Sequence, residues 1–334
     1  MVLVNRGRAP LIRAKKAYIL DGMKCKTKVA FFAYMALLLL SPAATICFAT
    51  EESSLADQKA AAGIIHENLI LSEDGKTVTG TVDKGITSAE IPQGVTSIAA
   101  KAFFHCENLR SIVIPEGVVT IGSWAFSHCR ALSEVSLPKS LSRIEAGAFS
   151  WCDKLFFIEF PAKLTYIGAN AFYSCASLKS VTLPKGIAKI RNSTFYGCLK
   201  LEEVIFPQSL TEIEENAFVN CAFKTVDFPP TLVQIGKSSF YHCPQLEKVS
   251  IPASVAEIGA KAFAHCPSLS KVEWSNHSWL KEVDADIFSK SPVYTNLNLP
   301  DSISLVNYNG PSQEEPVPPE LQGEQEEVPS KKKK

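Results

Sequence analysis

The sequence lacks an excess of charge of either sign. Its 34 lysines and arginines balance 34 aspartates and glutamates, so the formal net charge of the 334-residue chain is +0 at pH 7. A protein that binds nucleic acid or an anionic membrane through its overall field usually carries a basic excess. The charge balance therefore favours neither nucleic acid nor an anionic membrane surface as a partner.

The sequence also lacks the short motifs that mark common enzymes. It contains no G-x-S-x-G, no H-E-x-x-H and no phosphate-binding loop. Serine, histidine and aspartate occur, but no spacing singles any of them out as a catalytic set. We therefore predict a protein that is not an enzyme, with no catalytic residues and no cofactor.

A long hydrophobic run is missing as well. The apolar run from Val29 to Leu40 has 12 residues, whereas a membrane-spanning helix needs about 20. Three lysines between residues 24 and 28 precede this run, and small residues follow it up to Ala49, the pattern of a secretory signal. We predict that residues 1–49 are a secretory signal region, with Met23 as a possible true start and cleavage after Ala43 or Ala49.

Cys47 allows a second interpretation of this region. A lipoprotein signal would make Cys47 the acylated residue, although Ile46 stands where that motif prefers a small side chain. We predict that the protein contacts a membrane only through the signal or through this possible lipid anchor. Whether Cys47 is lipidated stays open at this point.

What the sequence does have is one phrase that recurs at a fixed interval. In its clearest copy it reads I-P-x-G-V-x-x-I-G-x-x-A-F-x-x-C-x-x-L-x-x-I/V, and the step is 23 residues except for one step of 22 between Pro207 and Pro229. The phenylalanines of the phrase are Phe103, Phe126, Phe149, Phe172, Phe195, Phe218, Phe240 and Phe263. The cysteines are Cys106, Cys129, Cys152, Cys175, Cys198, Cys221, Cys243 and Cys266.

A fixed period of this length indicates stacked supersecondary units rather than a closed globule. Within one unit, Val135 and Leu137 alternate with polar neighbours as in a half-buried strand, and residues 118–126 suit a short extended piece followed by a tight helical turn. One unit cannot bury its apolar face alone, so neighbouring units must stack. We predict a repeat solenoid with a parallel β-sheet on one face and short turns or helical segments on the other.

The repeat sets the domain boundaries. We predict a linker and β-hairpin cap over residues 50–85, with Asp74-Gly75 as the turn. The solenoid follows over residues 86–310; it ends in a degenerate cap, because Ser275 replaces the proline and no cysteine follows Phe288. Residues 311–334, rich in proline, glutamate and lysine, are predicted to be disordered, since they offer little apolar surface to bury.

The cysteines and histidines could also bind a metal or, for the cysteines, form disulfide bonds. Four histidines directly precede a repeat cysteine, so neighbouring units could supply a zinc-like set of two His and two Cys. Stacked cysteines are also within disulfide range. The alternative that we favour is a buried column of reduced thiols whose histidine neighbours point outward, with no metal.

The phrase resembles the BspA-type leucine-rich repeat. The match rests on a strand L-x-x-[IV]-x-[LI]-P followed by L-x-x-I-G-x-x-A-F-x-x-C, and it recurs eight times between Ile86 and Phe288. The resemblance implies a bacterial protein, secreted or on the cell surface, that binds proteins. It supplies no catalytic residue and no fixed ligand motif.

The strand residues between the buried positions are predicted to face outward and to carry any binding site. Most of them are polar, but Phe156 and Phe157 are adjacent in the strand L-F-F-I-E-F, so at least one should be exposed. An exposed aromatic is a common interface hot spot; the alternative is that Phe157 turns edgewise onto a neighbour. We predict a protein-binding surface made of Phe156, Phe157, Glu134, Glu159 and Lys179.

Two functions fit this sequence. The first is an adhesin at the surface of a bacterium, binding a host extracellular-matrix or cell-surface protein. The second is a structural scaffold of the cell envelope that binds another bacterial protein. Accessibility on intact cells would separate them.

Overall fold

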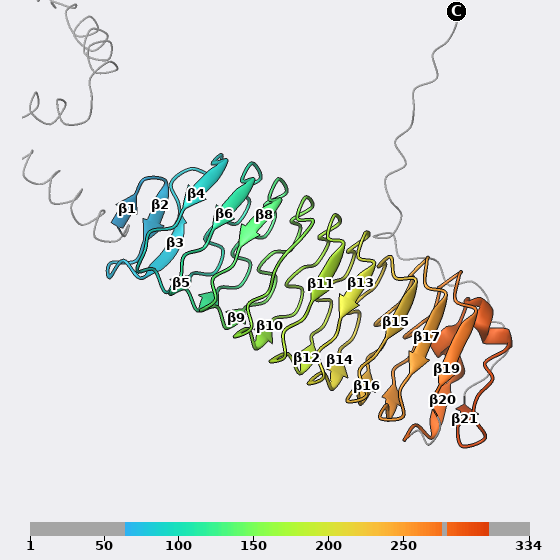
Figure 1. Cartoon of the computed structure of the whole chain (residues 1–334). Helices are drawn as coiled ribbons and strands as arrows, with labels where there is room; N and C mark the ends of the chain where they lie inside the picture. Colours follow the sequence, from blue (N-terminus) through green and yellow to red (C-terminus); the bar gives the residue numbers. More distant parts are fainter. Residues whose placement is uncertain (1–63, 276–278, 307–334) are drawn as a thin grey trace, which may run out of the picture. The chain divides into compact units, whose positions relative to one another are not determined.

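The computed structural model describes residues 64–275 and 279–306 (Figure 1). Over this range the chain forms a parallel β-solenoid in which each strand pairs with its counterpart one repeat away, as Thr120 does with Arg143. The 23-residue step of the sequence is therefore the length of one turn. The predicted repeat solenoid is confirmed. Among the described residues, helix is limited to two short 3₁₀ segments, η1 (Ala285–Phe288) and η2 (Pro292–Thr295).

One side of the solenoid, which we call the long-strand face, carries strands of three or four residues (Figure 1). They pair in parallel as three separate sheets. The first sheet contains β4 (Ser88–Glu90), β6 (Ser111–Val113) and β8 (Glu134–Ser136). The second contains β11 (Ser180–Thr182) and β13 (Glu203–Ile205), and the third β15 (Thr225–Asp227), β17 (Lys248–Ile251) and β19 (Lys271–Trp274).

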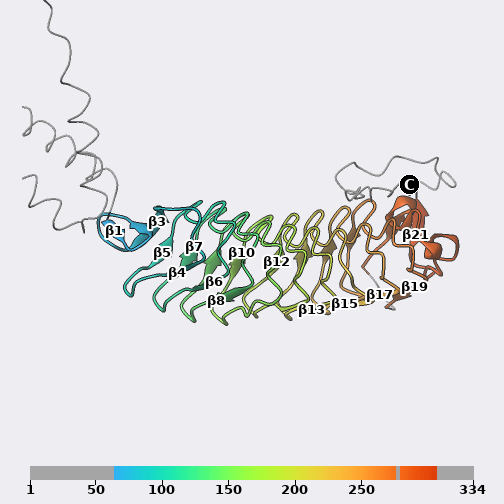
Figure 2. The same cartoon turned by 90° about the horizontal axis from the view of Figure 1, so that it is seen from above.

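A second ladder, which we call the short-strand face, is built from two-residue strands (Figure 2). These strands are the short extended pieces of the sequence analysis, and each buries its isoleucine. The first group is β5 (Ser97–Ile98), β7 (Thr120–Ile121), β9 (Arg143–Ile144) and β10 (Tyr166–Ile167). The second is β12 (Lys189–Ile190), β14 (Glu212–Ile213), β16 (Gln234–Ile235) and β18 (Glu257–Ile258).

The long-strand face corrects one prediction. The sequence suggested an unbroken sheet with a strand at Leu155–Phe160, but these residues are extended without forming a strand. The sheet is interrupted there, between β8 and β11. A second break separates β13 from β15, where the 22-residue repeat has lost one residue and Phe223, buried at 2% exposure, takes the place of the repeat leucine.

The core between the two faces is a spine of stacked phenylalanine rings. Phe103 and Phe126 lie 4.9 Å apart between ring centroids with an interplanar angle of 11°, and the stack continues to Phe263 and Phe288 at 5.6 Å. Every ring in this spine is fully buried. The spine therefore holds successive turns together even where a strand ladder is interrupted.

The cysteine column runs beside this spine. Each thiol from Cys129 onward donates a hydrogen bond to the carbonyl of the phenylalanine one repeat earlier; the distance from Cys129 Sγ to Phe103 O is 3.2 Å. At the C-terminal end Ser291 replaces the cysteine, and its hydroxyl donates to Phe263 O at 2.9 Å. The degenerate last unit thus keeps the bond although it lacks the thiol.

The third side of each turn consists of tight turns rather than helices. In every repeat the residues two before and two after the phenylalanine have a left-handed backbone; His105 and His128, for example, have φ of 59° and 61°. Histidine and asparagine tolerate this region better than most residues. The same geometry directs the histidines away from the buried cysteines next to them.

Both ends of the described solenoid carry different structure. At the N-terminal end β1 (Ile64–His66), β2 (Leu69–Leu71) and β3 (Thr77–Thr81) pair antiparallel, and β3 then pairs in parallel with β5. At the C-terminal end β20 (Glu282–Asp284) and β21 (Ser304–Val306) form a parallel pair, and η1 and η2 lie between them in the chain. The predicted signal region and the predicted tail at 311–334 lie outside the described residues.

Candidate protein-binding surface

Both phenylalanines that the sequence singled out lie at the surface. Phe156 is 50% exposed and Phe157 is 53% exposed, so neither turns its ring into the core. They lie beside the following repeat, because Lys179 N donates to Phe156 O at 3.3 Å. Glu134, Glu159 and Lys179 are exposed as well, but the structure shows no ion pair among them within the described residues.

A groove begins at Phe157 and crosses the next two repeats. Phe157 and Phe160 form one wall, and Ile205 and Phe206 form the other. Between the walls lies β11, which presents only the small side chains Ser180 and Thr182. The groove has a volume of ≈ 1260 Å³, and at about 4.8 Å per strand its walls are roughly 10 Å apart.

The sequence analysis missed the second wall of this groove. Ile205 is 52% exposed at the last position of β13, and Val113 at the same position of β6 is 63% exposed, but only Ile205 lines the groove. The signal was present as two bulky outward residues, Phe157 and Ile205, separated by one strand with small outward residues. A comparison of the sizes of the outward side chains on three neighbouring strands would have found the second wall.

The groove lies where the ladders of both faces are interrupted. Among the described residues, the backbone N–H groups from Phe156 to Phe160 donate to no partner. On the short-strand face, β10 and β12 belong to different sheets. The spine continues unbroken through these repeats: the ring centroids are 5.5 Å apart from Phe149 to Phe172 and from Phe172 to Phe195, similar to the 5.4 Å from Phe195 to Phe218.

An aromatic ring below the surface is not peculiar to the interrupted repeat. The ring of Phe160 packs against the spine ring of Phe172 at 5.5 Å and 67°. Phe206 and Phe228 occupy the same repeat position and pack edge-on against Phe218 and Phe240, yet the strands β13 and β15 before them form. The interrupted segment differs from these two in carrying two adjacent exposed rings, Phe156 and Phe157.

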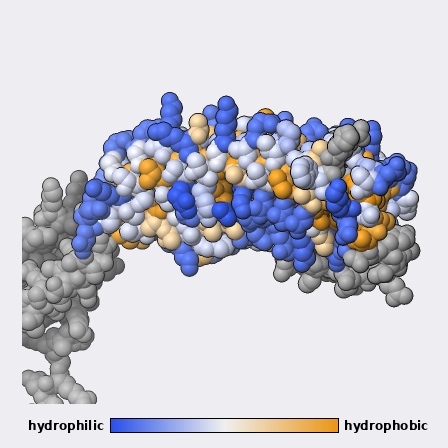
Figure 3. All heavy atoms as spheres, turned by 90° about the horizontal axis from the view of Figure 1, so that it is seen from below, coloured by the Kyte–Doolittle hydropathy of each residue, from blue (hydrophilic) through white to orange (hydrophobic). Residues whose placement is uncertain are grey.

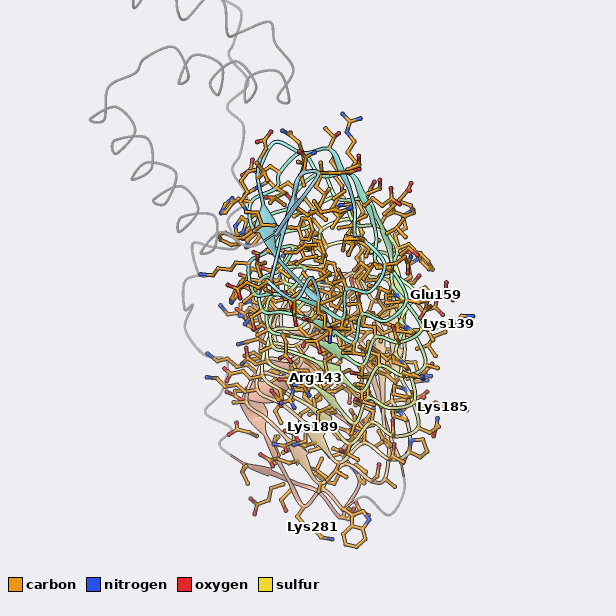
Figure 4. All side chains as sticks on the ribbon, turned by 90° about the vertical axis from the view of Figure 1, so that its left-hand side faces the viewer. Lys139, Arg143, Glu159, Lys185, Lys189 and Lys281 are labelled. Carbon is orange, nitrogen blue, oxygen red and sulfur yellow. The ribbon has the colours of Figure 1, made fainter. Side chains whose placement is uncertain are left out.

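Three exposed lysines lie on successive loops, and one of them, Lys185, lines the groove. Lys139, Lys163 and Lys185, which we call the lysine row, occupy successive loops that follow the strands of the long-strand face, and all three are exposed. None of them takes part in an ion pair of the described structure. In Figure 4, Lys139 and Lys185 project from the same side of the ribbon as Glu159, the one acidic residue of the groove lining.

The cysteine column offers no reactive group. All eight repeat cysteines are buried and unbridged. Burial raises the pKa of the Cys198 thiol to about 12 and that of Cys152 well above its usual range. The thiolate is the reactive form of cysteine, so these side chains are inert in the folded protein.

The histidines form stacked rings on the turn side. His105 and His128 stack at 4.4 Å between ring centroids, and Trp151 follows at 5.9 Å from His128. Burial, with smaller effects of His105 and Arg130, lowers the pKa of His128. Parallel stacking points the ring nitrogens side by side, and over residues 64–275 and 279–306 no cluster of three or more His, Cys, Asp or Glu is arranged to hold a metal.

The remaining surface is mixed in character. Figure 3 shows small apolar patches separated by polar residues on the side that it displays. Single exposed apolar side chains are normal on a soluble protein. The groove differs because several such side chains converge on one hollow, which can accept an apolar side chain of another molecule.

Comparison with known families gives one match over most of the chain. The family described as "BspA type Leucine rich repeat region" matches residues 82–202 and 188–310, in six copies. No curated protein matches the sequence. Where the structure describes the chain, no helix is both long and apolar enough to cross a membrane.

Solved structures that are similar to this chain come from several bacteria. A leucine-rich cell surface protein of Faecalibacterium prausnitzii A2-165 is 22% identical, with a TM-score of 0.52, over 76% of this chain and 98% of that protein. A leucine-rich repeat protein of T. pallidum is 27% identical over 62% of this chain and 90% of that protein, with a TM-score of 0.46. A leucine-rich repeat protein of Bacteroides ovatus ATCC 8483 is 22% identical over 72% of this chain and 90% of that protein, with a TM-score of 0.40.

Proposed function

The chain belongs to the BspA-type leucine-rich repeat family, and from this premise we propose that it is a non-catalytic protein-binding module whose binding surface is centred on the groove beside Phe156 and Phe157. The observation that carries the proposal is the convergence of exposed apolar side chains on that hollow. Interface energy is usually concentrated in a few aromatic anchors with near-neutral contacts around them. Phe156 and Phe157 supply the anchors, while Glu134, Glu159 and Lys179 supply a charged rim.

The proposed location is the bacterial surface or the surrounding medium. The secretory pattern in residues 1–49 supports export, and it lies outside the described residues. The F. prausnitzii protein with the same fold is described as a cell surface protein. At this location the groove would meet host molecules first, so the proposed partner is a host extracellular-matrix or cell-surface protein.

A binding assay tests the proposal. The purified full chain would be titrated onto immobilised fibronectin, laminin and collagen, onto host cells, and onto an envelope fraction of the organism itself. Saturable binding to a host target supports the adhesin. Saturable binding to the envelope fraction alone would overturn it in favour of the scaffold that holds another bacterial protein.

The double variant F156S/F157S locates the surface in the same assay. Loss of two hot-spot side chains costs at least about 2 kcal/mol, which corresponds to a dissociation constant roughly 30-fold higher. Circular dichroism would verify that the variant is folded, since both rings are half exposed. Unchanged binding by the folded variant would show that the binding surface lies elsewhere on the solenoid.

A further inference from the structure

One step of the solenoid lacks its backbone ladder on the short-strand face. This step, which we call the weak step, joins the turn that contains Phe172 to the turn that contains Phe195, and the strands on its two sides, β10 and β12, belong to different sheets (Figure 1). Gly168 N before the step and Glu214 N after it each donate to the preceding turn at 2.8 Å. Arg191 N holds the same position between them and donates to no backbone carbonyl of the described residues.

The long-strand face is open at the same step. The ladder that the described residues keep there is the bond from Lys179 N to Phe156 O, which is long at 3.3 Å. The loop between the two faces is also without a brace. Ser209 Oγ donates to Ile187 O of the preceding turn at 2.8 Å, but the counterpart of Ser209 at the weak step is Gly186, which has no side chain. Two sides of the solenoid and the loop corner between them therefore hold these two turns together weakly.

The turn side, in contrast, is continuous across the weak step. Asn170, Phe172 and Ser174 each donate a backbone N–H to the next turn, at 3.0, 2.9 and 2.6 Å. The rings of Tyr173 and Tyr196 stack on this side at 4.8 Å between centroids and 7°. One intact side opposite two open ones is the arrangement of a hinge, with the intact side as its axis.

The other interruptions in the described structure leave one ladder in place. On the short-strand face β9 pairs with β10 beside the segment Leu155–Phe160, and β14 pairs with β16 at the 22-residue repeat. On the long-strand face β17 pairs with β19 where the short-strand ladder ends at β18. The weak step therefore separates two halves that are each held together by a ladder at every turn.

The groove lies across the weak step. Its wall of Phe157 and Phe160 belongs to the half before the step, whereas the floor of β11 and the wall of Ile205 and Phe206 belong to the half after it. A rotation of one half about the turn side therefore changes the distance between the two walls.

We propose that the solenoid bends at the weak step, with the turn side as the axis, and that this motion opens and closes the groove. The guanidinium of Arg191 lies over the ring of Tyr166 at 4.6 Å, so this pair spans the step on the short-strand face and holds the closed form. The consequence that bending controls the access of a partner rests on the function proposed above. The bending itself is measured without a partner, so its failure and that of the proposed function are separate results.

Cysteine labelling tests the opening. Leu164 and Leu210 are fully buried at the same position of their turns, but Leu164 borders the weak step and Leu210 lies within the C-terminal half. In the folded full chain, iodoacetamide should alkylate L164C at least about ten times faster than L210C, because local opening exposes only the first. Mass spectrometry follows the native Cys175 in the same molecules, which is buried beside the intact turn side and should stay unmodified. Equal rates for the two variants, or alkylation of Cys175 as fast as that of L164C, would overturn the proposal.

Two pairs of spin labels measure the motion of the halves. The variant K139C/A253C carries its labels at the loop corner, and K154C/S268C carries them at the end of the turn side; each pair is five turns apart and spans the weak step. The native cysteines of the described repeats are buried and do not take up label. Double electron–electron resonance should give a distance distribution at least about twice as broad for K139C/A253C, because the corner opposite a hinge moves furthest. Distributions of equal width would show that the solenoid does not bend about its turn side.

Discussion

The cysteine of each repeat acts as a hydrogen-bond donor inside an apolar column. Cys152 Sγ donates to Phe126 O at 3.2 Å, and the same bond recurs from repeat to repeat. A buried carbonyl without a donor costs free energy, so a side chain of the right size without a donor is not equivalent. Ser291, which replaces cysteine at the C-terminal end and keeps the bond, shows that the donor rather than the sulfur is retained.

Two substitutions at Cys152 test this role. C152S keeps a donor, whereas C152V keeps the volume and the apolar character but leaves Phe126 O with only the backbone hydrogen bond from Cys129 N, at 3.1 Å. We expect C152V to have a free energy of unfolding about 0.5–1.5 kcal/mol lower than that of C152S, the net contribution of one hydrogen bond. Urea unfolding of both variants, followed by circular dichroism, measures the difference, and a C152V protein as stable as C152S would show that the column needs only apolar packing.

At the scale of the element, the spacing between successive turns leaves no room for some side chains. A Cβ atom on Gly168 would lie 2.4 Å from Ala146 N and 2.7 Å from Glu145 C, both of them backbone atoms of the previous turn. Only a glycine allows the two chains to approach this closely. The glycine that follows isoleucine in the repeat phrase therefore indicates a close backbone contact between turns.

Replacing this glycine should spread the turns apart. We expect G168A to lower the free energy of unfolding by about 1–3 kcal/mol, as overpacking does. G80A is the matched control, since its Cβ would meet only Ile70 Cδ1 at 3.7 Å, and it should be neutral or slightly stabilising. Thermal unfolding of the two variants compares them, and equal melting temperatures would refute the close contact.

Charged side chains tie neighbouring strands together at the end of the long-strand face. Lys248 of β17 and Lys271 of β19 each place Nζ 2.7 Å from a carboxylate oxygen of Glu273. Their hydrogen bonds, that of Lys248 first, lower the pKa of Glu273 to about 2 from its ordinary 4.5. The exposed carboxylate thus stays ionised in the folded protein at pH values where the unfolded chain takes up a proton.

The direction of the pH effect follows from this shift. A depressed carboxyl pKa contributes stability above about pH 4.5, and the contribution is lost as the pH falls towards 2. We expect the carboxyl carbon of Glu273 to titrate by NMR with a midpoint well below 4.5, and the K248Q/K271Q variant to bring the midpoint back towards 4.5. A normal midpoint in the unmodified protein would contradict the ion pairs.

Sequence and structure agree best for the elements that the repeat enforces. Period, phenylalanine spine and cysteine column are visible in the sequence because each turn must bury the same positions. The interruption at Leu155–Phe160 is not, because the segment keeps the strand pattern L-x-x-I-x-F, and the very similar L-x-x-V-x-F at residues 201–206 does contain a strand, β13. The groove escaped prediction because it requires the outward residues of three repeats to be compared by volume.

At the scale of the whole molecule, the solenoid separates stability from recognition. The spine and the columns repeat with little change, whereas the outward residues differ from one repeat to the next. A substitution at the surface therefore alters binding without unfolding the protein, which is the property expected of a family that presents one scaffold to different partners.

The central claim is that this groove, and not the rest of the solenoid surface, binds a protein partner. The most direct measurement compares the dissociation constants of the unmodified chain, F156S/F157S and V119S/V233S for the same immobilised partner. V119S/V233S replaces two side chains of similar exposure, 44% and 45%, that precede β7 and β16 on the short-strand face. We predict a rise of roughly 30-fold or more for F156S/F157S and a change of less than about twofold for V119S/V233S. Equal losses in the two variants, or a loss confined to V119S/V233S, would contradict the account.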